Sequence, residues 1–310
     1  MVQNHPINSH RTRPDGAIRR SRRSGLRWIA VVAALGALAS ACGDDDTTTT
    51  GSTTEAPTTS AQGGTSAPPV TSPITGEASF VYMTRGEHLA VVGREVPEGD
   101  DAIEVAVQAV LDGPDDLVES EAGIGSEVPE GTTLRGVAVE NGVATVDLSG
   151  EFESGGGSLS MQMRVAQIVF TVTEFPGVER VDIHIDGEAV ESIGGEGVPA
   201  RGLDRTQFQD LLPPILVQEP LPGAPLERTF TASGLANVFE GTVSIEVLDE
   251  SGEIVASGFG TGAMGEWQPF EAEITVPEGT RGSVIVRFYE ESMEDGRHLN
   301  VIEVPAVIVD

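Results

Sequence analysis

Residues 137–146 read VAVENGVATV, two short alternating runs joined by an Asn-Gly pair. Asn-Gly is the strongest short-range signal for a two-residue hairpin turn, because both residues accept the positive φ that this turn requires. The turn fixes the register and places the paired apolar residues on one face. The stretch therefore predicts an antiparallel hairpin whose apolar pairs are Val139–Ala144 and Val137–Val146.

Upstream, the pattern predicts another hairpin and a helix. Residues 80–84 and 89–96 read as its two strands. Asp101, with Glu104 three positions later, marks a helix start, and Gly113-Pro114 marks its end. The helical period gives this helix one apolar face, formed by Ile103, Ala106, Val107 and Val110.

Downstream, a Gly-rich loop at 155–158 leads into a second helix and a strand. Serine 158 or 160 is the expected helix cap. The helix has an apolar stripe and a polar stripe, as expected of an amphipathic helix packed on a sheet. The polar stripe, which we expect to be exposed, consists of Arg164, Gln167, Thr171 and Glu174. Residues 181–186 then alternate as a half-buried strand, so residues 77–212 are predicted to form an α+β domain.

Residues 213–310 show no helical period. Pro213-Pro214 marks the boundary, and about seven short alternating strands follow, separated by turn signals. The only cysteine of the chain lies far upstream, so no disulfide joins these strands. The pattern is typical of an all-β immunoglobulin-like sandwich.

The amino-terminal residues resemble a bacterial lipoprotein signal. Residues 38–42 read LASAC and end an apolar run that is too short to span a bilayer, and seven arginines precede it. The resemblance implies a signal peptide over residues 1–41, lipidation of Cys42 with a palmitate-type anchor, and location on the outer face of the cytoplasmic membrane. The lipobox residues are Leu38, Ala39, Ser40 and Ala41. Residues 21–27 also resemble a twin-arginine export signal, so both export routes stay open.

Charge limits the partners of the mature chain. The 310 residues carry 18 basic and 49 acidic groups, a formal net charge of −31. Seven arginines and one aspartate precede Cys42, so the remainder has 11 basic and 48 acidic groups and a net charge of −37. Such a charge disfavours binding to nucleic acid.

Residues 42–76, rich in Thr, Ser, Gly and Pro, are expected to form a disordered tether.

Two further resemblances cover most of the remaining chain. VATVDLS at 143–149, QIVFT at 167–171, FPGV at 175–178 and IDGE at 185–188 resemble the GerMN domain of sporulation and germination proteins. PILV at 214–217, GLANVFE at 234–240, GEW at 265–267 and YEES at 289–292 resemble the immunoglobulin-like domain that often follows it in envelope lipoproteins. The resemblance implies a ring-building-motif-like fold and a role in assembly, without agreed catalytic residues.

Few residues suggest a metal-binding or cofactor-binding site. Asp182, His184 and Asp186 share one face of a strand and could ligate a divalent cation, although a solvated acidic face is the simpler interpretation. The run GTGAMG at 260–265 fits a nucleotide-binding pattern, but no helix follows it. We therefore expect no cofactor.

These observations predict a non-catalytic envelope protein that binds or assembles with a protein partner or peptidoglycan. Self-association through the polar stripe of the second helix is one mode, with Arg164 as the candidate contact residue. A peptidoglycan-remodelling enzyme that uses Glu151 or Glu153 as acid or base is the alternative. A solute receptor associated with an importer is a further alternative.

We expect Cys42→Ala to abolish lipidation and to move the protein from the membrane to the soluble fraction or the medium. Metabolic labelling with a palmitate analogue, followed by fractionation, checks this. Equal labelling of the wild type and the variant would contradict the lipobox.

Overall fold

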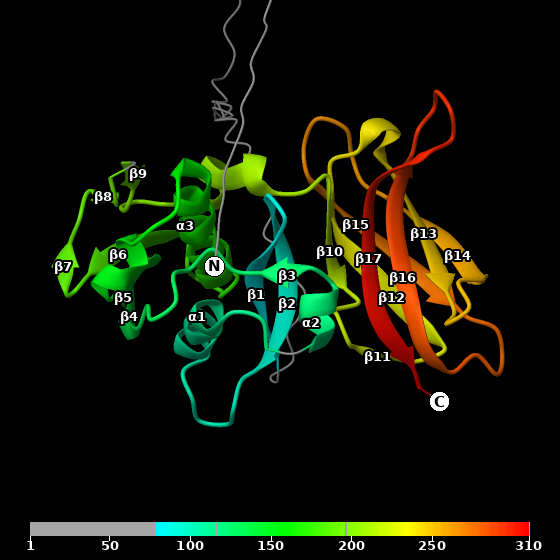
Figure 1. Ribbon diagram of the computed structural model, residues 1–310, viewed down its shortest axis with the longest axis horizontal. Coiled ribbons are helices and arrows are strands. Elements are labelled where there is room, and N and C mark those ends of the chain that lie inside the picture. The colour runs from blue at the N-terminus through cyan, green and yellow to red at the C-terminus, as the bar shows by residue number, and fades with distance from the viewer. Residues whose placement is uncertain (1–77, 116, 196, 310) are drawn as a thin grey trace, which may run out of the picture. The chain divides into compact units, whose positions relative to one another are not determined.

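The computed structural model describes residues 78–115, 117–195 and 197–309 (Figure 1). The predicted signal peptide, lipobox, Cys42 and tether lie outside these residues. No helix within the described part is long and apolar enough to cross a membrane.

The first folded part has the predicted order of hairpin, helix, hairpin, helix and strand. Two 3-10 turns, Gly150–Glu153 and Arg205–Leu211, accompany the regular elements. The regular elements are β1 (Ala78–Arg85), β2 (His88–Glu95), α1 (Ala102–Asp112), α2 (Leu117–Glu121), β3 (Ile124–Gly125), β4 (Leu134–Glu140), β5 (Val143–Leu148), α3 (Ser158–Val172), β6 (Arg180–Ile185), β7 (Glu188–Ala189), β8 (Ser192–Ile193) and β9 (Val198–Pro199).

The central hairpin has the predicted register. Val139 pairs with Ala144 and Val137 with Val146, and the turn residues Asn141 and Gly142 have φ values of 52° and 81°. β6 joins β5 in parallel through the α3 crossover, which gives a sheet of order β4-β5-β6-β7. β1 pairs with β2 and β3 in a separate sheet.

The first helix also follows the prediction. The Asp101 carboxylate caps α1 by accepting hydrogen bonds from the backbone N–H groups of Ile103 and Glu104. Gly113, at φ 80°, ends the helix. The apolar face is buried at Ala106, Val107 and Val110.

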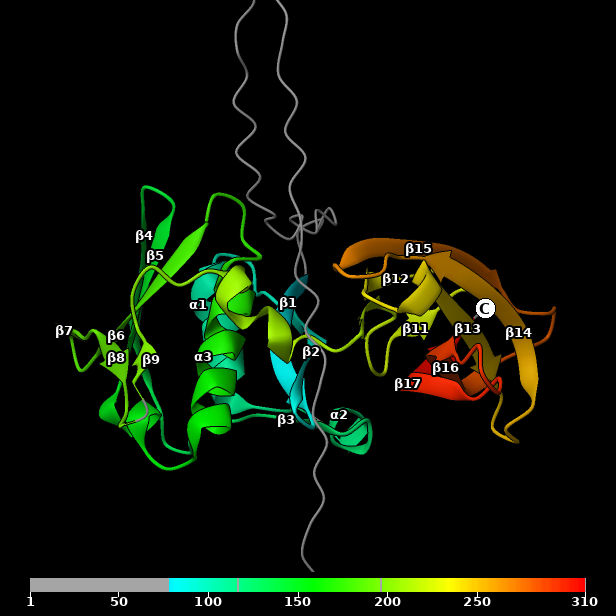
Figure 2. The ribbon, with the colours of Figure 1, turned by 90° about the horizontal axis from the view of Figure 1, so that it is seen from above.

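The polar stripe of α3 is not exposed, contrary to the sequence-based expectation. Figure 2 shows α3 between the two sheets of this part. The exposed fractions are 2% for Arg164 and 0% for Gln167 and Thr171. The expectation failed because the alternation of apolar and polar residues on a helix cannot reveal that a second sheet covers its polar face.

Each residue of this buried stripe has a specific partner. The Thr171 hydroxyl accepts a hydrogen bond from the Tyr82 backbone N–H at 2.9 Å, and Gln167 Nε2 donates to the Tyr82 carbonyl oxygen at 3.4 Å. β3 pairs only with Thr84 and Arg85 of β1, so helix side chains complete the strand edge where β3 does not reach. Unpaired buried backbone groups are costly, and this arrangement avoids them.

Glu174, just beyond the end of α3, anchors a buried polar cluster. One carboxylate oxygen accepts from the Tyr82 hydroxyl at 2.6 Å and from Arg205 at 2.7 Å. The Arg205 guanidinium also lies 5.4 Å from the centre of the Tyr82 ring and 5.1 Å from that of Phe170. Burial, reinforced by the Glu174 charge, raises the pKa of Tyr82 far above its usual value.

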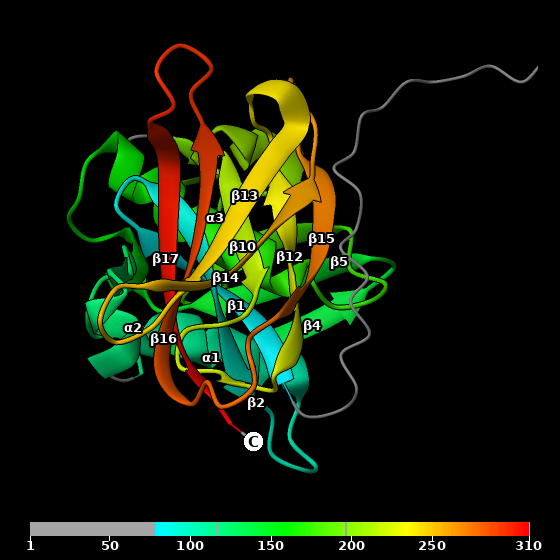
Figure 3. The same cartoon turned by 90° about the vertical axis from the view of Figure 1, so that its right-hand side faces the viewer.

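The second folded part is the predicted β-sandwich. Its strands are β10 (Ile215–Glu219), β11 (Pro225–Leu226), β12 (Thr229–Ala236), β13 (Thr242–Leu248), β14 (Ile254–Thr261), β15 (Gln268–Thr275), β16 (Gly282–Glu291) and β17 (His298–Ile308). They form two sheets, of orders β10-β12-β15 and β11-β17-β16-β13-β14, which face each other across an apolar core (Figure 3). The predicted alternation appears in β13, where Val243, Ile245 and Val247 are buried.

Thr171→Val should lower the free energy of unfolding by about 1–3 kcal/mol, because it leaves the Tyr82 N–H buried without an acceptor. Thr171→Ser keeps the acceptor and should retain more of the stability. The exposed Thr133→Val serves as a surface control and should change stability by less than about 0.5 kcal/mol. Urea denaturation measures all three, and equal effects of the Val substitutions at 171 and 133 would contradict the role of the hydroxyl.

Because the pKa of Tyr82 is raised on folding, its linked stability is fully present below the unfolded pKa of about 10 and is lost as the pH rises above it. Between about pH 10 and 12, stability should therefore fall more steeply for the wild type than for Tyr82→Phe. Denaturation at several pH values measures this slope. Tyr289→Phe is the comparison: burial and Glu246 also raise the pKa of Tyr289, the other tyrosine, but by less, so this variant should lose less of the slope than Tyr82→Phe. Ionisation of both phenols near pH 10 without loss of structure would be the contrary result.

Candidate functional site

The metal-ligand candidates do not converge. The Asp182 carboxylate accepts a hydrogen bond from the Gly202 N–H at 2.6 Å, while His184 lies within β6. Asp186 lies beyond the end of this strand, at φ 51°, with a carboxylate oxygen 3.5 Å from Arg135. The described residues include no group of three or more His, Cys, Asp or Glu side chains placed to hold a metal ion.

Arg164 is a structural residue and not part of an exposed contact surface, which corrects the expectation for this position. Its guanidinium donates to the carbonyl oxygens of Phe152, Ser154 and Gly155 at 2.7, 2.9 and 3.2 Å, and to the Ser160 hydroxyl at 3.1 Å. Burial lowers its pKa. Arg164 therefore fastens the Gly-rich loop to α3.

The Gly-rich loop is shaped around this guanidinium. Gly156 has φ 77°, and a Cβ at this position would lie 2.7 Å from an Arg164 terminal nitrogen. α3 begins after Gly157, which makes no side-chain cap hydrogen bond, so the expected serine cap is wrong. The loop points its carbonyl oxygens at the Arg164 guanidinium. An anion-binding loop would instead point backbone N–H groups at its ligand.

Glu151 and Glu153, the candidates for an acid or base, lie in the turn before this loop. A hydrogen bond from Ser149 lowers the pKa of Glu151. A Glu153 carboxylate oxygen accepts from the Gly194 N–H at 2.8 Å. A glycosidase general acid needs a raised pKa so that it keeps its proton near neutral pH, and Glu151 is shifted in the opposite direction.

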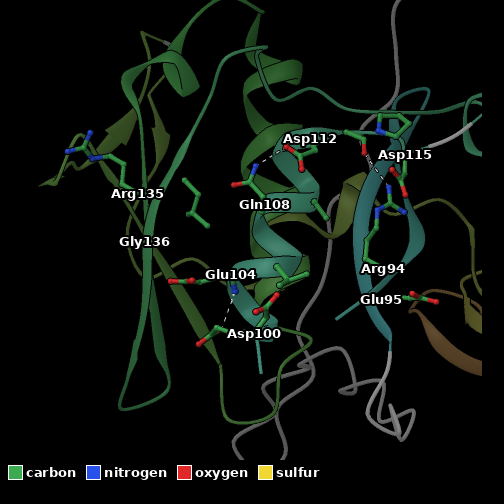
Figure 4. Close-up of a pocket in the computed structure, with 15 residues that line it drawn as sticks. Arg94, Glu95, Asp100, Glu104, Gln108, Asp112, Asp115, Arg135 and Gly136 are labelled. Atoms are coloured by element: carbon green, nitrogen blue, oxygen red, sulfur yellow. Dashed lines mark hydrogen bonds between the residues drawn. The ribbon is translucent and has the colours of Figure 1, made fainter. Parts of the chain in front are cut away.

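A surface groove of about 650 Å³ lies along the exposed side of α1. Figure 4 shows α1 in its centre, with the edge strand β4 on one side and β2 on the other. Leu134, Arg135 and Gly136 of β4 form one wall, and Arg94 and Glu95 of β2 belong to the opposite side. Six carboxylates line the groove: Glu95, Asp100, Asp101, Glu104, Asp112 and Asp115.

Both arginines that border the groove are bound to other carboxylates. Arg94 forms two hydrogen bonds with the buried Glu119, at 2.5 and 2.9 Å, and a third with the Gly113 carbonyl oxygen at 3.2 Å. Arg135 lies 3.5 Å from Asp147 and from Asp186. None of the six groove carboxylates forms an ion pair within the described part of the chain. The groove therefore carries a concentrated negative charge.

Sequence reasoning missed this groove, although part of the signal was present. Asp101, Glu104 and Gln108 recur at helical spacing, and Asp112 continues the same exposed side of α1. The position of β4 opposite this side cannot be read from spacing. Gln108 Nε2 donates a hydrogen bond to Asp112 at 2.8 Å, which holds these two side chains of α1 in place within the groove.

Comparison with known proteins identifies both folded parts. Residues 80–191 match the Germane family, described as "Sporulation and spore germination", and residues 214–297 match Gmad2, the immunoglobulin-like domain of bacterial spore germination. No curated protein matches the chain.

Several solved structures are similar at low identity. The tandem GerMN domains of the sporulation protein GerM from Bacillus subtilis share 14% identity over 74% of this chain and 60% of theirs, with a TM-score of 0.38. The first GerMN domain of the same protein shares 21% over 42% of this chain and 98% of its own, with a TM-score of 0.34. A putative lipoprotein from Clostridium perfringens shares 20% over 44% and 90%, with a TM-score of 0.31. The chain thus spans about 60% of the tandem GerM structure, and from the two family matches it contains a Germane domain followed by an immunoglobulin-like domain of the bacterial spore germination type.

Proposed function

We propose that this chain is a lipid-anchored protein of the cell envelope that binds or assembles with partners and carries out no catalysis. Its two domains come from sporulation and germination families. The observation that carries the proposal is the α1 groove, where six carboxylates face solvent and both bordering arginines are bound elsewhere. The groove suits a protein surface that presents basic side chains.

Electrostatics supports a basic partner over a second copy of this chain. The chain has 18 basic and 49 acidic groups, so two copies repel each other at most approaches. Facing charges of opposite sign speed association and fix orientation, and their effect falls as salt rises. A lipid anchor and tether at residues 42–76 would hold the groove near other envelope proteins and raise the effective concentration.

The acidic residues whose pKa departs from the usual value do not suit general-acid catalysis. Among the described residues these are Glu151, Asp249 and Asp295, and in each case hydrogen bonds lower the pKa. Such groups are ionised at neutral pH and are poor proton donors. The buried polar cluster of Tyr82, Glu174 and Arg205 is closed to substrate by its own hydrogen bonds.

Replacing Glu104 and Asp112 with lysine together should reduce partner capture at least fivefold, because it reverses two charges in the groove. A photo-crosslinking amino acid at Gln108, used in intact cells, measures capture. The control is Glu271→Lys with Glu273→Lys, an equal charge change on the exposed side of β15. Thermal unfolding verifies that all variants are folded, and capture that persists in the groove variant would contradict the proposal.

The alternatives give different outcomes in the same preparation. Zymography on peptidoglycan with divalent ions present should show no clearing, and clearing lost in Glu151→Gln or Glu153→Gln would establish the enzyme. Crosslinking on lipid vesicles detects self-association. A captured species with the mass of two chains would make a second copy the occupant of the groove.

A further inference from the structure

Three connections of the immunoglobulin-like domain meet at one end of its sandwich. They are the β12–β13 turn at 237–241, the β14–β15 connection at 262–267 and the β16–β17 connection at 292–297. The first and third lie at the upper end of this domain in Figures 1 and 3. The first and second are joined by hydrogen bonds from Val238 N–H to the Ala263 oxygen at 2.9 Å and from Gly265 N–H to Asn237 Oδ1 at 2.8 Å. We call this end the apex.

The apex exposes one large apolar side chain from each connection. The exposed fractions are 60% for Phe239, 66% for Met264 and 69% for Met293. Phe239 and Met293 line a common pocket of about 380 Å³, together with Ser244 of β13. Phe259, 68% exposed, is the cross-strand partner of Ser244 and extends the apolar surface along β14. Large exposed apolar side chains grouped at one end of a domain, two of them around a common pocket, mark an interaction surface.

The backbone that presents Phe239 is fixed. Glu290 is 7% exposed, and its carboxylate accepts from the Phe239 N–H and from Asn300 Nδ2, both at 2.9 Å. Glu240, the next residue, has φ 64°, a conformation that a non-glycine residue keeps only where its surroundings hold it. The backbone at Phe239 is therefore held in place before any partner binds, which lowers the entropic cost of binding.

The rim of the apex is acidic. Glu240 and Glu291 line the pocket, and Glu266 and Glu294 flank it in the connections. None of these four exposed carboxylates forms an ion pair with a described residue. Arg297, the basic residue of the β16–β17 connection, is paired with Asp295 at 2.5 Å.

We propose that the apex docks a polypeptide segment that carries apolar side chains beside basic ones. The apolar side chains fill the pocket between Phe239 and Met293, and the basic ones face the carboxylates of the rim. Methionine adapts its shape to irregular partners, so two exposed methionines suit a segment of variable sequence. This surface belongs to the second domain and is separate from the groove of the first.

Charge decides between this occupant and two others. Anionic lipid head groups would be repelled by the rim, and the carboxylates would lose hydration at a membrane surface. A second copy of this acidic chain would bring like charges together. A basic and apolar segment satisfies both properties of the apex at once.

Methionine-methyl NMR of the full chain tests the proposal at single sites. The probe is a labelled twelve-residue peptide of alternating lysine and leucine. Its addition should shift the signals of Met264 and Met293, while those of the buried Met83, Met161 and Met163 stay in place. Fluorescence anisotropy is measured in the Glu104→Lys/Asp112→Lys background, so that the peptide is not held by the groove of the first domain. There, Phe239→Ser with Met293→Ser should weaken binding at least tenfold, and Glu240→Gln with Glu291→Gln at least threefold.

Matched controls separate the apex from general attraction to an acidic protein. Ile254→Ser, an exposed apolar change at the opposite end of β14, and the groove pair Glu104→Lys with Asp112→Lys should leave the methyl shifts unchanged. A glutamate–leucine peptide should not bind. The proposal is overturned if the lysine–leucine peptide fails to bind or binds without the Met264 and Met293 shifts. Equal binding to the Phe239/Met293 variant, or equal shifts with phosphatidylglycerol vesicles or upon self-association without peptide, would do the same.

Discussion

The buried polar side of α3 is the constraint on which the first domain depends. The helix lies between two sheets, so its polar groups must find partners inside the protein. Thr171 and Gln167 provide those partners to the backbone of Tyr82, about 90 positions away in the chain. A shift of β1 or α3 by one residue would leave several buried donors and acceptors unpaired at once. These hydrogen bonds therefore fix one alignment of α3 against β1.

Local signals predicted the elements, whereas their burial depended on distant segments. Asn141-Gly142 and Asp101 act within a few residues, and the hairpin and the helix start were found where these residues place them. Arg164 was expected on the surface because its helical stripe is polar, and nothing in that spacing shows that loop carbonyls surround it. The groove shows the same limit. Its acidic helix face can be read from the sequence, but its walls come from β2 and β4.

The two proposed binding surfaces share one electrostatic arrangement. In each, the nearby arginine is held by its own carboxylate, Arg94 by Glu119 in the groove and Arg297 by Asp295 at the apex, so the remaining acidic groups keep their field. The surfaces differ in apolar content. The groove is polar and suits an association sensitive to salt, while the exposed Phe239 and methionines of the apex add contact that salt does not weaken.

The contacts of Arg164 also bear on how this protein can change through evolution. Three of its four partners are main-chain oxygens, which every amino acid supplies. The side chain at Ser154 can therefore be exchanged without loss of those bonds. The positions of Gly155, at φ 61°, and Gly156, which also has no room for a Cβ, favour glycine, and Arg164 has no substitute with the same planar donors. Sequence change in this loop should thus be concentrated at positions such as Ser154, while Gly155, Gly156 and Arg164 are retained and preserve its shape.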